Sequence, residues 1–302
     1  MTMKRTSITS GQKDAFEQLV IAAAKHGIKL ALEKVKADQD GWQKMLGSGD
    51  ELRTAIAEII VAKTRELSVS NQFADEEAES SYGYLSGYKP KGITEQTNIL
   101  RELFPGIGFA DEKLAEQPLP ENAEGYFAIP NWEKNPKMFG KTYGEALQVI
   151  LDKIKQTRNG SFYNYREGQL GPKYLRQSER TKKFFSELNE AQGNPDILIV
   201  PAQFGIRHRG RSVRRAREVF LANEFGLGAF ASGIMLLTHP ERLGDYNDLY
   251  IDCAGDEYAP DGDVEFVGAP VFHFDDGRVK FNAYGIVGAG SHYGSASGFF
   301  QQ

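Results

Sequence analysis

Apolar residues recur at helical spacing through the first third of the chain. The first amphipathic stripe, with residues three to four apart, consists of Phe16, Leu19, Val20, Ala23 and Ala24. A second helix, capped by Ser48 or Asp50, is predicted from an apolar face made of Leu52, Ile56, Ile59 and Ile60. A third helix is predicted over residues 95–104, where Pro105-Gly106 ends it.

The pattern changes after residues 117–125, a polar segment with two prolines that has the character of a linker. Thr142 and Glu145 form a capping box that opens a helix. The segments predicted further on are a helix around 184–188, a buried strand over 196–202, a helix over 212–223 and a buried apolar stretch over 227–237. Asp275-Asp276-Gly277 stands between two alternating segments and predicts a β-hairpin.

These patterns together predict an α+β fold. We expect a helical N-terminal region over 1–116, a linker over 117–125, and a mixed α/β domain over 126–302 with a C-terminal β-hairpin.

Composition narrows the class of protein. Of the 302 residues, 40% are apolar and 25% are charged, which are ordinary values for a globular protein. The most apolar stretch, 225–237, is too short to span a bilayer, and the polar first residues lack the apolar core of a signal peptide. With a single cysteine, Cys253, we expect a protein of a reducing compartment, the cytoplasm, with no membrane partner.

Six arginines fall between positions 207 and 217, in a chain whose net charge is −5. The run from Gly205 to Ser212 has the spacing G-x-x-x-x-G-basic-S after an apolar strand, which is the layout of a phosphate-binding loop. Arg211 stands where that loop requires lysine, and a planar guanidinium does not replace a compact ammonium. A looser anion site remains the leading hypothesis, with its residues Arg207, Arg209, Arg211, Ser212 and Arg214.

The alternative is an amphipathic helix whose arginines are solvated or paired with acids of the same chain. In that helix Val213, Ala216 and Phe220 face inward, while Arg211, Arg214, Arg215 and Glu218 lie on the opposite side. The obvious internal partner is an acidic stretch, DCAGDEYAPDGDVE, over residues 252–265.

The acidic stretch also has the oxygen donors that Mg²⁺ or Ca²⁺ prefers. Asp252, at the predicted end of a short strand, and Asp256 are the candidate ligands for a divalent cation, although their spacing does not match an EF-hand.

Three functional hypotheses follow. The first is binding of a phosphate-bearing, nucleotide-like small ligand at the arginine-rich turn, with a divalent cation and with phosphoryl transfer or phosphoester hydrolysis as an extension. The second is a nucleic-acid-associated protein that uses the same arginines and the aromatic and basic residues of 162–176. The third is a structural or assembly protein, a homo-oligomer with charge-paired subunit contacts.

Overall fold

The chain divides into two compact units, residues 1–68 and 69–302. The computed structural model describes residues 9–36, 38–67, 71–262 and 265–301. The first unit holds three helices: α1 (Ser10–Lys34), α2 (Gln39–Gly47) and α3 (Gly49–Leu67). The two helices predicted here are therefore confirmed, and α2, which begins at the N-cap Asp38, was not anticipated.

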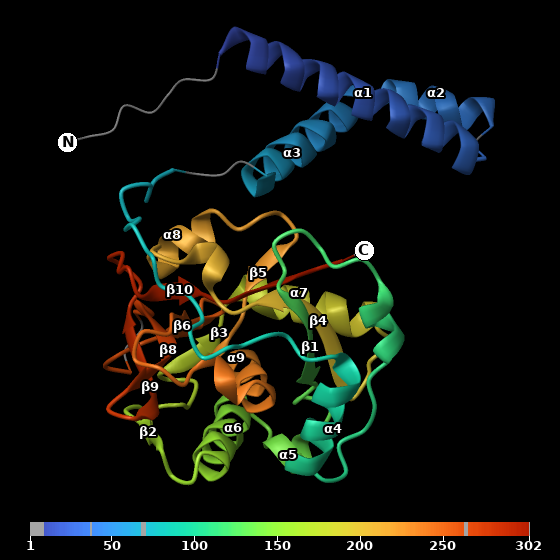
Figure 1. Cartoon of the computed structure of the whole chain (residues 1–302). Coiled ribbons are helices and arrows are strands. Elements are labelled where there is room, and N and C mark those ends of the chain that lie inside the picture. The colour runs from blue at the N-terminus through green and yellow to red at the C-terminus, as the bar shows by residue number, and fades with distance from the viewer. Residues whose placement is uncertain (1–8, 37, 68–70, 263–264, 302) are drawn as a thin grey trace. The chain divides into compact units, whose positions relative to one another are not determined.

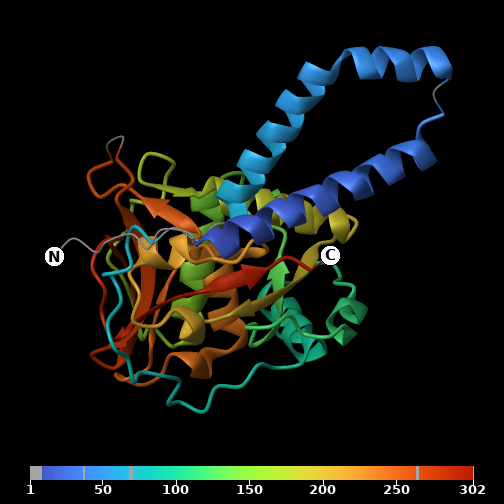
Figure 2. The same cartoon turned by 90° about the horizontal axis from the view of Figure 1, so that it is seen from above.

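The helices of the first unit do not bury one another's apolar side chains. α1 and α3 diverge along most of their length (Figure 2). No described side chain between residues 9 and 64 is buried. This unit therefore has no hydrophobic core among its described residues.

The second unit contains short helices around two sheets (Figure 1). Its helices are α4 (Ile93–Leu103), α5 (Pro136–Phe139), α6 (Tyr143–Thr157), α7 (Glu179–Ala191), α8 (Val213–Glu218) and α9 (Ala229–Thr238). Three 3₁₀ turns are also present: η1 (Glu112–Glu116), η2 (Ile206–His208) and η3 (Pro240–Arg242).

The first sheet has the strand order β1-β4-β11-β5, and its strands pair antiparallel. Its members are β1 (Gly125–Pro130), β4 (Ile197–Gln203), β11 (Ser297–Phe299) and β5 (Glu224–Gly226). β4 is buried along its whole length, as the apolar run over 196–202 predicts, because β1 and β11 flank it on both edges.

The second sheet follows the order β10-β6-β8-β7-β3, with β9 on β8 and β2 on β9. Its members are β2 (Phe162–Asn164), β3 (Leu175–Gln177), β6 (Tyr250–Asp252), β7 (Asp256–Tyr258), β8 (Gly268–Asp275), β9 (Arg278–Gly285) and β10 (Tyr293–Ser295). The predicted hairpin is β8–β9, and its two-residue turn, Asp276 and Gly277, has positive φ at both positions, as a type I′ turn requires.

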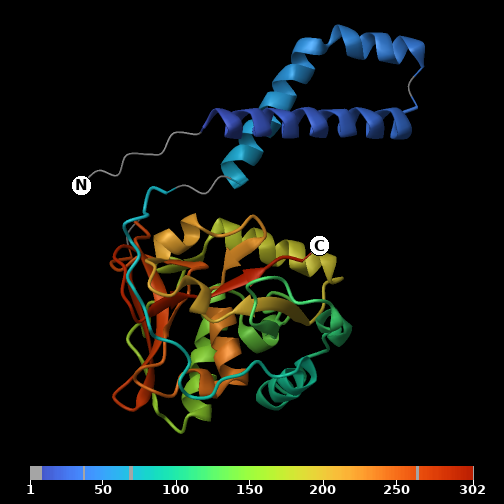
Figure 3. The same cartoon turned by 45° about the horizontal axis from the view of Figure 1, so that its top comes forward.

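One continuous hydrophobic core joins both sheets. α9 is buried along its whole length and packs beside α6 and β1 (Figure 3). The chain passes from β10 in the second sheet to β11 in the first through Ala296, which is fully buried. The C-terminal segment therefore ties the two sheets together.

Local signals fix several helix starts in this unit. Thr142 accepts the Glu145 N–H and the Glu145 carboxylate accepts the Thr142 N–H, which confirms the predicted capping box. The α4 residues Ile93 and Leu100 belong to the same core as β1 and α6, and residues 117–125 lie within the second unit. That 117–125 separates two independently folding domains stays a prediction. None of the helices in the described ranges is both long and apolar enough to span a bilayer.

The turn that follows β4 requires a residue without a side chain at Gly205. Gly205 has a φ of 125°, and a Cβ built there would lie 2.6 Å from the carbonyl oxygen of Gly294. We expect Gly205→Ala to lower the free energy of unfolding by about 3 kcal/mol or more, because it adds a backbone clash to an unfavourable φ. Gly277→Ala is the matched control, since Gly277 has a φ of 72° and nothing within 4 Å; it costs about 1 kcal/mol. Equal losses for the two variants in urea denaturation would contradict this assignment.

Candidate functional site

The arginine segment, residues 205–217, leaves β4 through η2 and enters α8. Val213, Ala216 and Phe220 are buried, as predicted. Ser212 caps α8, and its Oγ accepts the Arg215 N–H at 3.1 Å. The helix ends at Glu218 and does not reach the expected residue 223. Arg215 is 9% exposed, against the expectation that it faces outward, because another segment of the chain covers that side.

The backbone of the turn is fully occupied by the protein itself. Each N–H from Gly205 to Ser212 donates to an acceptor of the protein. The N–H groups of Gly205 and Arg207 donate to Gln203 Oε1, and that of Ile206 donates to Tyr84 Oη. The N–H groups of residues 208 to 212 donate, in chain order, to the carbonyl oxygens of Gly205, Ile206, Tyr293, His208 and Glu76. A phosphate-binding loop works by directing such N–H groups at the ligand. The turn therefore has the spacing of that loop without its donors.

The guanidinium groups of the segment are likewise engaged. Four of them form ion pairs with glutamates outside the segment, among them Arg207 with Glu224 at 3.1 Å, Arg211 with Glu77 at 3.3 Å, and Arg214 with Glu76. Arg215 bridges Glu77 at 2.7 Å and Glu218 at 2.9 Å. Arg209 is exposed and donates to the Tyr82 carbonyl at 3.1 Å.

Residues 71–80 supply most of these contacts, and they pair with the arginine segment much as an extra strand would. The Ala78 N–H donates to Gly210 O at 2.7 Å, and Glu77 and Arg211 form an antiparallel bridge. Hydrogen bonds from Arg214 hold the pKa of Glu76 below its usual value, against the opposing effect of burial. No pattern of neighbouring residues predicts this pairing, since the partners stand more than 130 positions apart.

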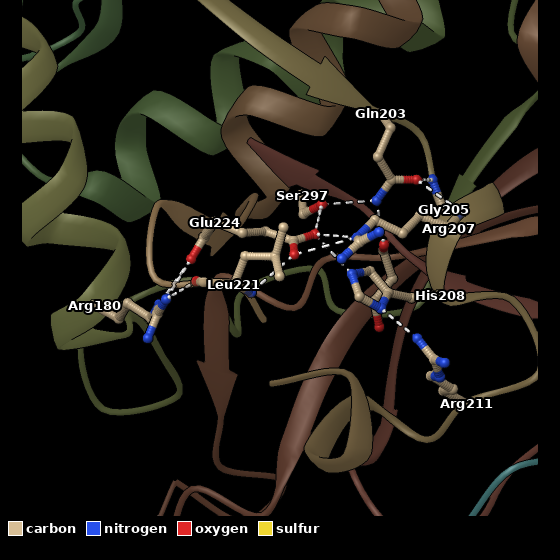
Figure 4. A network of polar contacts seen from close by, with 10 residues as sticks. Arg180, Gln203, Gly205, Arg207, His208, Arg211, Leu221, Glu224 and Ser297 are labelled. Atoms are coloured by element: carbon tan, nitrogen blue, oxygen red, sulfur yellow. Dashed lines mark hydrogen bonds and ion pairs between the residues drawn. The ribbon is translucent and has the colours of Figure 1, made fainter. Parts of the chain in front are cut away.

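Glu224 is the centre of a second, buried network (Figure 4). Its carboxylate is fully buried and accepts from Arg207 Nε, His208 Nε2, Ser297 Oγ and the Leu221 N–H. Burial raises the pKa of Glu224, but the hydrogen bonds from His208, Ser297 and the Leu221 N–H outweigh it and hold the pKa below its ordinary value.

His208 is the neutral partner of this carboxylate. Arg211 donates to its Nδ1 at 3.1 Å, so Nδ1 carries no proton and Nε2 donates to Glu224 at 2.7 Å. Burial lowers the pKa of His208; the hydrogen bond and charge of Glu224 oppose this effect, and the charges of Arg207 and Arg211 add to it. This agrees with the hydrogen-bond pattern, and the ring joins two charged groups without a charge of its own.

The two candidate metal ligands, Asp252 and Asp256, lie close in sequence, but their carboxylates have different surroundings. Asp256 accepts from Tyr143 Oη at 2.8 Å and from the Ala229 N–H at 2.7 Å. Asp252 is buried at the end of β6, where burial raises its pKa to about 7. The described residues contain no group of three or more His, Cys, Asp or Glu side chains suited to a metal ion. A divalent cation at Asp252 and Asp256 stays a prediction, and Asp263 lies outside the described residues.

The acidic stretch is not the partner that the arginines use. Among the described residues of the stretch, the arginine contacts are those of Arg217, which donates to the backbone carbonyls of Ala254 and Asp256. The acids that pair with the segment are Glu76, Glu77, Glu218 and Glu224. Binding of an outside anion by Arg207, Arg209, Arg211, Ser212 and Arg214 stays a prediction that these contacts do not favour. The nucleic-acid hypothesis relies on the same arginines and stays a prediction too.

No family model matches this chain, and no curated protein or solved structure is significantly similar to it. The function proposed below therefore depends on the contacts, burial and charges of this chain's own residues.

The Glu224 network makes a stability prediction. Glu224→Gln keeps the size of the side chain but removes the charge opposite Arg207 and one of the accepting oxygens. We expect it to lower the free energy of unfolding by about 3 kcal/mol, because breaking a buried pair leaves the other charge uncompensated. Glu179→Gln is the control; its side chain is 90% exposed and we expect a change within about 0.5 kcal/mol. If urea denaturation gave equally small changes in the free energy of unfolding for both variants, Glu224 would have no structural role of this kind.

Asp252 makes a prediction about pH. Its pKa is about 7 in the folded protein against an ordinary 3.8, so between those values the folded state holds more protons and stability falls as pH rises. Asn cannot ionise, so we expect the stability advantage of Asp252→Asn to grow across this window, to at most about 4 kcal/mol, and to level off above it. Asp261→Asn, at an exposed position, is the control. Chemical denaturation at several pH values tests this, and a pH-independent difference would exclude the burial of an ionisable Asp252.

Proposed function

We propose that this chain is a structural protein that self-associates through its N-terminal helices. The observation that supports this is the absence of any buried side chain among the described residues 9–64. That part of the chain nevertheless carries eleven of the 21 exposed large apolar side chains: Phe16, Leu19, Ile21, Ile28, Leu32, Val35, Met45, Leu46, Leu52, Ile56 and Ile59.

The long helix α1 is apolar on two faces. At 3.6 residues per turn, Phe16, Leu19 and Val20 lie on one face, and a second face more than about 100° away is formed by Ile21, Ile28 and Leu32. A helix that is apolar on several sides needs neighbours on more than one side. The stripe on α3, formed by Leu52, Ile56 and Ile59, is exposed as well and offers a matching surface.

Charge favours a second copy of the same helices as the occupant. The three helices contain eight Lys or Arg and eight Asp or Glu, so their net charge is zero. A surface of this kind does not attract a polyanion, whereas two copies bring interleaved charges of both signs to each other.

The exposed apolar area of the N-terminal helices is also large enough for a stable interface. Eleven partly exposed large apolar side chains, at roughly 100 Å² each, offer on the order of the ~800 Å² per partner that a stable interface buries. Burial of apolar area at this scale drives association in water. The compartment in which this takes place, expected to be the cytoplasm, stays a prediction.

The test is the mass of the full chain in solution. Size-exclusion chromatography with light scattering at several concentrations should give a multiple of the 33.6 kDa protomer. We expect Leu19→Asp combined with Ile28→Asp to shift the protein to the monomer, because each face of α1 then buries a charge.

Leu85→Asp combined with Phe109→Asp is the matched control, since both side chains are exposed and lie in the second unit. We expect this variant to keep the mass of the wild type. A monomeric wild type, as would follow if the second unit covers these faces, would refute the proposal. An unchanged mass for the α1 variant would refute it as well.

A further inference from the structure

A cavity of about 460 Å³ brings together three arginines from separate elements of the second unit. Arg176 comes from β3, Arg180 from the first turn of α7, and Arg217 from α8. The arginine segment and the basic, aromatic segment 162–176 therefore meet here, one through Arg217 and the other through Arg176.

Arg217 has hydrogen-bond partners but no ion-pair partner among the described residues. Its Nε donates to Ala254 O at 2.9 Å and its Nη2 to Asp256 O at 2.6 Å. Carbonyl oxygens fix the guanidinium plane without cancelling its charge.

The other two guanidinium groups are held in place at the cavity wall. Arg176 donates to Glu257 at 2.7 Å and stacks over the Phe266 ring at 3.8 Å. Arg180 donates to the carbonyl oxygens of Leu221 and Glu224. Groups fixed in this way lose little side-chain entropy when a ligand binds.

The acids at the cavity leave a positive balance. Glu257 is paired with Arg176, and Glu179, which is 90% exposed, is paired with Lys182. Among the described residues that line the cavity, three are arginines and two are glutamates. The N-terminal end of the 13-residue helix α7 borders the same cavity, and its dipole adds to the field.

We propose that this cavity binds the phosphate group of a small phosphorylated molecule. Planar guanidinium forks match the tetrahedral oxygens of phosphate, and a dianion supplies the counter-charge that Arg217 lacks. The volume exceeds that of a free phosphate and leaves room for an attached organic group. This site is separate from the turn at Arg207–Ser212 and does not depend on self-association.

The test uses inorganic phosphate and inorganic pyrophosphate as probes on the full chain. At constant ionic strength, we expect each at millimolar concentration to raise the melting temperature above that in chloride, and calorimetry to give one site per chain. Arg176→Ala, at a half-exposed position, should weaken phosphate binding about tenfold, which corresponds to loss of one charge-assisted hydrogen bond. Arg217→Lys keeps the charge but loses the fork, and should weaken binding as well.

Arg209→Ala combined with Arg211→Ala is the control, and we expect it to bind both probes as the wild type does. Loss of binding in this variant with retention in Arg176→Ala would move the site to the arginine-rich turn and overturn the proposal. The absence of a heat signal and of a melting shift in the wild type would overturn it as well.

Discussion

The second unit depends on neutralising a concentrated run of positive charge inside the fold. Glu76, Glu77, Glu218 and Glu224 take up four of the six arginines. Without these acids, the charges of Arg207 and Arg215, whose side chains are 20% and 11% exposed, would lie in a medium of low dielectric, which is unfavourable. The segment 71–80 is therefore part of the unit, since it brings two of the four acids to the arginines.

The two units differ in whether they bury their apolar side chains. The second encloses α9 and β4 in a core that spans both sheets, and it closes that core with the strand β11 near its end. The helices of the first unit also carry apolar side chains, but they form no core among its described residues. Under the proposed self-association, a second copy of the chain covers the apolar side chains that the first unit leaves exposed.

Signals confined to a few neighbouring residues predicted their structures correctly. The Thr142–Glu145 cap, the Asp276-Gly277 turn and the buried strand over 196–202 follow from local hydrogen bonding, backbone conformation and apolar runs. The contacts that decide the candidate sites were not predictable in this way. Glu76 reaches Arg214, and Arg176 meets Arg217, only because the fold brings distant segments together. The sequence therefore identified the arginines but not their partners, nor that Arg209 and Arg217 form no ion pair among the described residues.

The central claim is that the arginines serve the fold through specific acids, and a double-mutant cycle on Arg214 and Glu76 tests it most directly. Urea denaturation of the wild type, Arg214→Ala, Glu76→Ala and the double variant gives the coupling energy between the two side chains. The account predicts a stabilising coupling above the error of the measurement, because Arg214 donates to both oxygens of Glu76. A coupling indistinguishable from zero would contradict it and would leave these guanidinium groups available to an outside partner.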